Sequence, residues 1–306
     1  MRKFASLLLV IIMAFSLYVP AFAESEAAPE LKLHFLNQRP VCPEPYVHGD
    51  CTLAELPNGQ LMLIDSGLDI DPSHTIAWLE SHIGDTKHID YFIGTHYHQD
   101  HTGTVDDLMK AGYTFGEYYT NGWGDNNIGV DLDFIAMVWG KTIEEKVLRS
   151  GDSLTIGDVV IDVLWPLPDD VPSSMENMDS KELNEHSLVF QMIYGDFTAL
   201  FAADVLERSE AEIVALHGDR MMSSFYKAAH HGNDDGNSQI FLDTIEPYAS
   251  LSFARWIYGK NATERIKRIS MVHYIVGEDG HVDLVTDGKT MTITCETREP
   301  EIFELP

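Results

Sequence analysis

The sequence predicts an α+β fold in which two mixed β-sheets pack against each other and helices cover their outer faces. Two observations predict it: strand-like segments fill both halves of the chain, and helical patterns separate these strand-rich blocks. Because a sheet must bury its apolar face against another layer, this order of elements indicates a layered sandwich. No Pro/Gly/Ser-rich linker or internal repeat interrupts it, so residues 31–306 are expected to form one domain.

The first half of the chain is expected to be mostly strands. Their predicted ranges are 31–36, 51–56, 61–64 and 89–93. The second and third flank Pro57-Asn58-Gly59, a turn signal typical of a hairpin. A short helix is expected at 104–110, ended by Gly112.

The second half mixes strands and helices. Strands are expected at 159–165, 187–194, 198–203, 224–229, 249–253, 273–276, 282–285 and 291–295. Helices are expected at 207–217, 238–245 and 263–269. The turn Gly195-Asp196 joins two of the strands into a hairpin.

Residues 1–23 have the composition of a secretory signal peptide. Arg2 and Lys3 precede the apolar stretch 7–17, and Ala21-Phe22-Ala23 is a cleavage signal. An uncleaved N-terminal anchor is the alternative, although the stretch is short for a membrane span. We therefore expect a secreted or cell-envelope protein, cleaved near Ala23, with a short polar segment at 24–30 and no membrane span in the mature chain.

The chain is strongly acidic. It has 49 acidic and 20 basic residues, and its formal net charge is −29. The signal segment carries +2, so the mature chain carries −29 − 2 = −31. A surface of this charge disfavours binding to phosphate polymers, so long nucleic acid is not an expected partner.

Three cysteines are too few for a disulfide framework. Cys42 and Cys51 close a short loop, and export would permit a bridge between them. Two free, partly buried thiols are the alternative.

One run of residues carries the chemistry: His96-Tyr97-His98-Gln99-Asp100-His101. In an extended segment, residues i and i+2 project to the same side, so His96 and His98 can hold one ion. The chain then turns into a helix that directs Asp100 and His101 to a second position. Imidazole and carboxylate are ligands that zinc, manganese and iron accept. The run therefore predicts two metal ions.

Further ligands follow in order along the chain. Asp204 ends a predicted strand, where its carboxylate can bridge two ions. His186 begins the hairpin whose return strand ends at Asp204, so the two can lie side by side. Either His230 or His231 can complete the second ion; we prefer His231, because Gly232 would let the backbone approach the metals closely. His230 would then face the substrate or support the ligands.

These motifs, together with Leu63-Ile64-Asp65-Ser66-Gly67, resemble those of the metallo-β-lactamase superfamily over essentially the whole mature chain. Residues 47–50, 57–59, 184–188 and 229–232 look most like two subgroups. One is the hydrolase domain of competence-type DNA-uptake proteins, and the other is the phosphorylcholine esterase of teichoic acids. The resemblance implies an αββα sandwich with two metals at the sheet edge.

The resemblance also implies a ligand set. One ion would be held by His96, His98 and His186, and the other by Asp100, His101 and His231. Asp204 would bridge the two ions, and Asp65 would support the ligands without binding a metal. In both subgroups an Asn often stands where His186 stands here.

The expected cofactors are two divalent ions, zinc or manganese, and the expected nucleophile is a metal-bound hydroxide, with Asp100 as the candidate proton acceptor. The full ligand set fits phosphoesterases better than β-lactamases. We therefore expect hydrolysis of a phosphodiester or phosphorylcholine-type bond in a small phosphorylated substrate or a cell-wall polymer unit. The alternatives are a competence-type extracellular DNA nuclease, a β-lactam hydrolase and a non-catalytic metal-binding receptor.

Trp123 and Asn184 are the candidate substrate-contacting residues. Trp123 lies between two glycines in a loop, and an exposed aromatic ring beside the metals could bind a quaternary ammonium group by a cation–π contact. Core packing of the aromatic residues is the alternative.

Overall fold

The computed structural model describes residues 28–42, 49–123, 134, 136–137, 143–170, 179–253 and 259–306. The predicted signal peptide, 1–23, and its cleavage position at Ala23 lie outside these residues, as do Val47 and His48 of one motif. Within the described ranges, no helix has the length and apolar composition needed to cross a membrane.

Two mixed β-sheets form the centre of the fold. Within the described ranges, the larger sheet has nine strands in the order β16-β15-β14-β1-β2-β3-β4-β5-β6. Its strands are β1 (Leu31–Phe35), β2 (Thr52–Glu55), β3 (Leu61–Ile64), β4 (His88–Gly94), β5 (Thr114–Thr120), β6 (Glu145–Val147), β14 (Val282–Thr286), β15 (Thr290–Cys295) and β16 (Glu301–Glu304).

The smaller sheet has seven strands in the order β13-β12-β11-β10-β9-β8-β7 over the same ranges. Its strands are β7 (Ser153–Ile156), β8 (Val159–Trp165), β9 (Val189–Tyr194), β10 (Phe197–Phe201), β11 (Phe225–Lys227), β12 (Ala249–Ser252) and β13 (Val272–Ile275). The antiparallel hairpin β9–β10 matches the one predicted from the Gly195-Asp196 turn.

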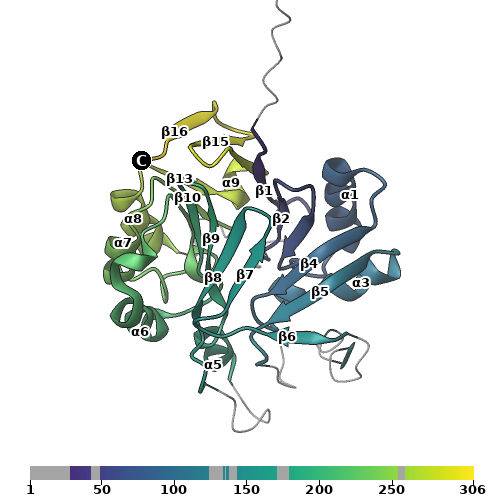
Figure 1. Cartoon of the computed structure of the whole chain (residues 1–306), viewed down its shortest axis with the longest axis horizontal. Coiled ribbons are helices and arrows are strands. Elements are labelled where there is room, and N and C mark those ends of the chain that lie inside the picture. The colour runs from purple at the N-terminus through teal and green to yellow at the C-terminus, as the bar shows by residue number, and fades with distance from the viewer. Residues whose placement is uncertain are drawn as a thin grey trace, which may run out of the picture.

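Helices cover the outer faces of both sheets (Figure 1). The helices of the described ranges are α1 (Pro72–Ile83), α2 (Gln99–Thr102), α3 (Val105–Lys110), α5 (Ser180–Glu185), α6 (Glu207–His217), α7 (Gln239–Ile245), α8 (Lys260–Ile269) and α9 (Val276–Asp279), with 3₁₀ turns η1 (Gly218–Met221) and η2 (Ala229–Gly232). Figure 1 shows α1 and α3 beside the larger sheet and α6, α7 and α8 beside the smaller one.

Three apolar clusters hold these layers together. The largest lies between the sheets and includes Leu33 of β1 and Phe190 of β9. A second packs α1 and α3 onto the larger sheet, and a third packs α6, α7 and α8 onto the smaller one. Since each sheet buries both faces, the layer order is αββα, and the predicted fold class is confirmed.

Several helices and strands were not predicted from the sequence: α1, β5, β6, β7, α5, α9 and β16. The start of α1 follows a common capping pattern, in which Asp71 Oδ1 accepts a hydrogen bond from Ser73 N at 3.1 Å and Pro72 occupies the first turn. The bridge considered between Cys42 and Cys51 is wrong, because Cys51 is a free buried thiol. Burial raises the pKa of that thiol well above its usual value.

The topology brings several loops to one edge of the sandwich. β3 and β4 run parallel, so Asp65 and His96 leave the larger sheet at the same end. β10 and β11 run parallel in the smaller sheet, and Asp204 and His231 follow their carboxyl ends. The predicted metal ligands therefore come from both sheets.

Candidate metal centre

His96, His98 and Asp204 form one buried group of ligand atoms. His96 Nε2 lies 2.9 Å from His98 Nδ1 and 3.8 Å from Asp204 Oδ2. The extended backbone before α2 places the two imidazoles on one side, as the i, i+2 spacing predicts.

A second group shares Asp204. His101 Nε2 and His231 Nε2 each lie 3.2 Å from Asp204 Oδ2, and His231 Nε2 lies 3.0 Å from Asp100 Oδ2. The carboxylate of Asp204 thus lies beside ring nitrogens of both groups. This is the position from which one residue can serve two ions.

Carboxylates behind the ligands orient two of the imidazoles. Asp65 Oδ2 lies 2.8 Å from His101 Nδ1, and its carboxylate also accepts hydrogen bonds from the backbone N–H and hydroxyl of Thr95. Asp50 Oδ1 lies 2.7 Å from His231 Nδ1. A partner on the far ring nitrogen fixes which nitrogen is left for a metal.

Asp50 and Lys227 are parts of this site that the sequence analysis missed. Lys227 forms a buried ion pair with Asp50 Oδ2 and donates a hydrogen bond to Ala203 O at 3.1 Å. Asp50 lies within reach of the second ligand group, but both of its oxygens are engaged, so we assign it to orienting His231. A lysine in the apolar strand Phe225-Tyr226-Lys227 was the available signal, because buried lysines are normally paired.

The electrostatics of the centre favour a cation. Burial raises the pKa of Asp204, but His101 and His231 outweigh this and hold the pKa of Asp204 well below its usual value. Burial lowers the pKa of His101, yet Asp204 and Asp65 raise it to about 10. Burial keeps the pKa of His96 well below its usual value, so its lone pair is available.

The atoms that face the centre fit a metal. Among the described residues, His101 Nε2, His231 Nε2 and Asp204 Oδ1 are buried and make no hydrogen bond of good geometry, although both nitrogens lie within 3.2 Å of a carboxylate oxygen. Buried polar atoms are normally satisfied, so such a cluster indicates an ion or a water. Imidazole and carboxylate are the donors that first-row divalent ions accept.

The charge balance points the same way. Asp50, Asp65, Asp100 and Asp204 carry −4 and Lys227 carries +1, which leaves −3 once the imidazoles have lost their protons to bind metal. Two divalent cations would bring the sum to +1. A loaded centre would therefore attract an anionic group.

His186 is not brought to this centre. Its Nδ1 lies 2.7 Å from Glu182 O, and its Nε2 lies 3.0 Å from Asp170 Oδ2. Its ring stacks on Trp123 at a centroid distance of 3.7 Å. His186 caps the carboxyl end of α5, and its ring contacts Glu182, Asp170 and Trp123, whereas the hairpin predicted a position beside Asp204.

Trp123 is also placed differently from the expectation. Its side chain is buried in the cluster that packs against the larger sheet, and its Nε1 donates to Asp170 O. Core packing, the alternative considered for the aromatic residues, therefore describes Trp123.

Asn184 and His230 lie together at the rim of the centre. Asn184 Nδ2 lies 3.4 Å from His230 Nε2, and Asn184 Oδ1 is buried without a hydrogen-bond partner among the described residues. His230 Nδ1 lies 2.7 Å from Asp235 Oδ1, and its Nε2 lies 3.9 Å from Asp204. Because Asp235 holds Nδ1 of His230, Nε2 is the ring nitrogen that faces the centre.

The turn η2 holds His230 and His231 in an unusual backbone conformation. Their φ angles are 45° and 55°, in the left-handed region that costs free energy for residues with a Cβ. Gly232 follows at φ 90°, and a Cβ there would lie 2.6 Å from the Cβ of Ser252. The glycine is therefore needed for packing against β12, and the turn buries His231 while it leaves His230 partly exposed at the rim of the centre.

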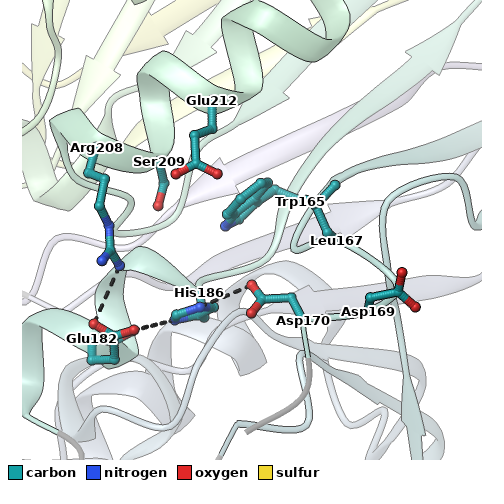
Figure 2. Close-up of a pocket in the computed structure, with 9 residues that line it drawn as sticks. All are labelled: Trp165, Leu167, Asp169, Asp170, Glu182, His186, Arg208, Ser209 and Glu212. Carbon is teal, nitrogen blue, oxygen red and sulfur yellow. Dashed lines mark hydrogen bonds and ion pairs between the residues drawn. The ribbon is translucent and has the colours of Figure 1, made fainter.

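A pocket of about 360 Å³ lies beside α5 (Figure 2). Its described lining residues are Trp165, Leu167, Asp169, Asp170, Glu182, His186, Arg208, Ser209 and Glu212. Figure 2 shows His186 between the carboxylates of Asp170 and Glu182. The helix links the pocket to the metal centre, because Ser180 Oγ lies 3.1 Å from His98 Nε2.

Comparisons with known proteins agree with this geometry. A family model described as the metallo-beta-lactamase superfamily matches residues 46–231. The chain is 26% identical over 175 residues to ComE operon protein 3 of Bacillus subtilis (strain 168), covering 57% of this chain and 20% of that protein. It is 28% identical over 105 residues to competence protein ComA of Neisseria gonorrhoeae, covering 34% and 15%. The chain thus spans a fifth or less of these relatives.

Solved structures share the fold. Tm1679, described as a metal-dependent hydrolase of the beta-lactamase superfamily, is 13% identical with a TM-score of 0.52, covering 80% of this chain and 95% of that one. The metallo-beta-lactamase fold protein YhfI of Bacillus subtilis is 15% identical with a TM-score of 0.50 and the same coverages. The chain therefore belongs to the metallo-β-lactamase superfamily of metal-dependent hydrolases, and its buried His and Asp side chains form a group able to bind metal.

Proposed function

We propose that this protein is a binuclear metal-dependent hydrolase of phosphoester bonds in small substrates. The observation that carries the proposal is the position of Asp204, whose carboxylate belongs to both ligand groups. We assign His96, His98 and Asp204 to one ion. We assign Asp100, His101, His231 and Asp204 to the other, with zinc or manganese as the metal.

When bound, such ions supply an activated water and positive charge that stabilises a phosphoryl group during in-line displacement. The protein side chains position this chemistry. Asp65 and Asp50 hold the rings of His101 and His231, so that Nε2 of each faces the centre. The balance of +1 in a loaded centre favours a substrate with a negative charge at the reacting group.

His230 is our candidate for the proton donor to the leaving oxygen. Asp235 holds its Nδ1, its Nε2 points towards Asp204, and its side chain is 20% exposed, so a substrate can reach it. The sequence analysis gave Asp100 a proton-transfer role. Burial raises the pKa of Asp100, but His231 and His101 bring it far below its usual value, so Asp100 is a weak base and we assign it as a ligand.

The surroundings favour a small substrate. The described lining of the pocket beside α5 contains four acidic residues and Arg208, and the whole chain carries −29. The acidic pocket lining and the negative net charge repel a long polyanion. They do not repel a neutral or cationic leaving group, such as a choline-type alcohol. The proposed export of the chain would place this activity outside the cytoplasm, where a cell-wall polymer unit is available.

An extracellular nuclease of the competence type is the second candidate. The observation that favours it is the similarity to ComE operon protein 3 and to a second relative that is named competence protein ComA.

The test is a substrate screen of the full chain loaded with zinc or manganese. A chromogenic phosphodiester, a chromogenic phosphorylcholine ester, a chromogenic cephalosporin, and plasmid and single-stranded DNA at low salt are compared with the same protein carrying His98→Ala. We expect the small phosphoesters to be hydrolysed much faster than the cephalosporin, and His98→Ala to abolish this activity.

Equal rates on the phosphodiester and the cephalosporin would overturn the phosphoesterase proposal. Rapid DNA degradation that is lost in His98→Ala would favour the nuclease. A metal content of zero after loading would instead leave only a non-catalytic role.

A further inference from the structure

A second cluster of potential ligands shares no residue with the centre described above. It lies where β1, β14 and the last turn of α1 meet. His34 and Asp283 are direct partners in the antiparallel register of β1 and β14, so their side chains project from the same face of the sheet. The last turn of α1 adds His82, whose ring centroid lies 4.2 Å from that of His34.

Three ligand atoms converge in this cluster. His34 Nδ1 lies 2.6 Å from Asp283 Oδ1, and His82 Nε2 lies 3.7 Å from the same oxygen. Two ligands bound about 2.1 Å from a tetrahedral zinc ion lie roughly 3.4 Å apart. The distances from Asp283 Oδ1 to the two ring nitrogens, 2.6 Å and 3.7 Å, lie on either side of this value, so a small side-chain shift would accommodate the ion.

The far nitrogen of each imidazole is already held. His34 Nε2 lies 3.0 Å from Glu55 Oε1, and His82 Nδ1 lies 2.9 Å from Trp78 O. A metal-binding histidine usually donates its other ring N–H to a carboxylate or a backbone carbonyl. With protons on these far nitrogens, the lone pairs of His34 Nδ1 and His82 Nε2 face the space beside Asp283.

We propose that His34, His82 and Asp283 bind a single first-row divalent cation such as zinc, separate from the catalytic ions. Two imidazoles and one carboxylate are a donor set that zinc, nickel and copper accept. The side chain of Asp283 is 40% exposed, so water can complete the coordination. Asp283 and the orienting Glu55 offset the charge of the ion, and Glu55 Oε2 also lies 3.5 Å from Lys32 Nζ.

Such an ion would join α1 to the larger sheet, because its ligands come from the helix and from two strands. The role we assign to it is therefore to fix α1, and hydrolysis does not pass through it. Loss of the ion should leave the catalytic centre and its metal content unchanged.

The test counts zinc in the full chain at equilibrium with micromolar free zinc. Wild type is compared with His82→Ala, with the nearly isosteric Asp283→Asn, and with the control His88→Ala, which removes an exposed histidine at the start of β4. We expect one equivalent fewer in His82→Ala and Asp283→Asn than in wild type, and no change in His88→Ala. Far-ultraviolet circular dichroism checks that each variant is folded.

A second measurement needs no variant. Crystals of the wild type are equilibrated with the same concentration of free zinc, and anomalous scattering at the zinc edge locates the bound ions. We expect a peak between His34, His82 and Asp283. The absence of this peak, or equal zinc counts in wild type and both cluster variants, would overturn the proposal. The same groups would then be an ion cluster of protonated imidazoles and carboxylates.

Discussion

Replacing Lys227 with methionine should show how the buried Asp50–Lys227 pair supports the metal centre. Both side chains are 3% exposed, so the magnitudes of surface ion pairs do not apply. Removing one partner of a buried pair costs about 3–5 kcal/mol, because the other charge stays buried. Here His231 remains beside Asp50, so we expect the lower end of that range, about 3 kcal/mol.

The same substitution should weaken metal binding. Lys227 holds Asp50, which orients His231, and it also holds the carbonyl of Ala203, next to Asp204. Losing a partner that orients a metal ligand typically lowers affinity by about 10- to 100-fold. We expect a decrease of this size for zinc, measured by competition with a chelator.

Urea unfolding measures the stability change. Asp50→Asn combined with Lys227→Met should be more stable than Lys227→Met alone, because no unpaired charge remains buried. The control is Lys87→Met, which removes a partly exposed lysine paired with Glu80 and should lower the free energy of unfolding much less than Lys227→Met does. The reasoning is refuted if Lys227→Met and Lys87→Met have the same free energy of unfolding.

Three further predictions follow from the site and its support. His230→Gln should lower kcat about 10²- to 10⁴-fold for a phosphoester with an alkyl leaving group. The loss should be much smaller for a nitrophenyl ester, because its leaving group needs no proton donor. Equal losses on the two esters would contradict the role of His230 as an acid. Asp204→Ala should abolish hydrolysis and reduce the content of both ions, and normal turnover would exclude a bridging role. Burial raises the pKa of Glu210 from 4.5 to about 7, so its stabilising contribution is complete below pH 4.5 and lost as pH rises through 7. Between pH 4.5 and 8, the free energy of unfolding of wild type, measured in urea, should therefore fall by up to about 3 kcal/mol more than that of Glu210→Gln. Parallel pH profiles of the two proteins would refute this.

The strands of the two sheets were largely predictable from the sequence, because their apolar residues are continuous or alternate. The missed elements lacked such patterns or were short. β5 reads Thr-Phe-Gly-Glu-Tyr-Tyr-Thr, where neither alternation nor a continuous apolar run is clear, and parallel pairing with β4 determines its conformation. α5 has six residues, too few for a helical period to be recognised.

At the metal centre, sequence order was informative where ligands share one short segment. His96, His98 and His101 lie in a single run, so local geometry alone brings them together. His186 had no such local constraint. Whether its ring faces Asp204 depends on the turn at the end of α5 and on Asp170, which lies 16 residues earlier and contacts its Nε2. Tertiary contacts of this kind cannot be derived from spacing.

Asp50 and Lys227 belong to the metal centre although neither needs to bind a metal, because they hold the ligand His231 in place. The second ligand group depends on His231, which lies in a strained left-handed turn of the smaller sheet. Asp50 reaches this ring from the segment before β2 in the larger sheet, and Lys227 anchors Asp50 from β11. The contact therefore couples the two halves of the sandwich at the edge where the ligands meet. Because strained backbone persists only where its surroundings hold it, we infer that this ion pair compensates the cost of the turn and keeps His231 Nε2 directed at Asp204.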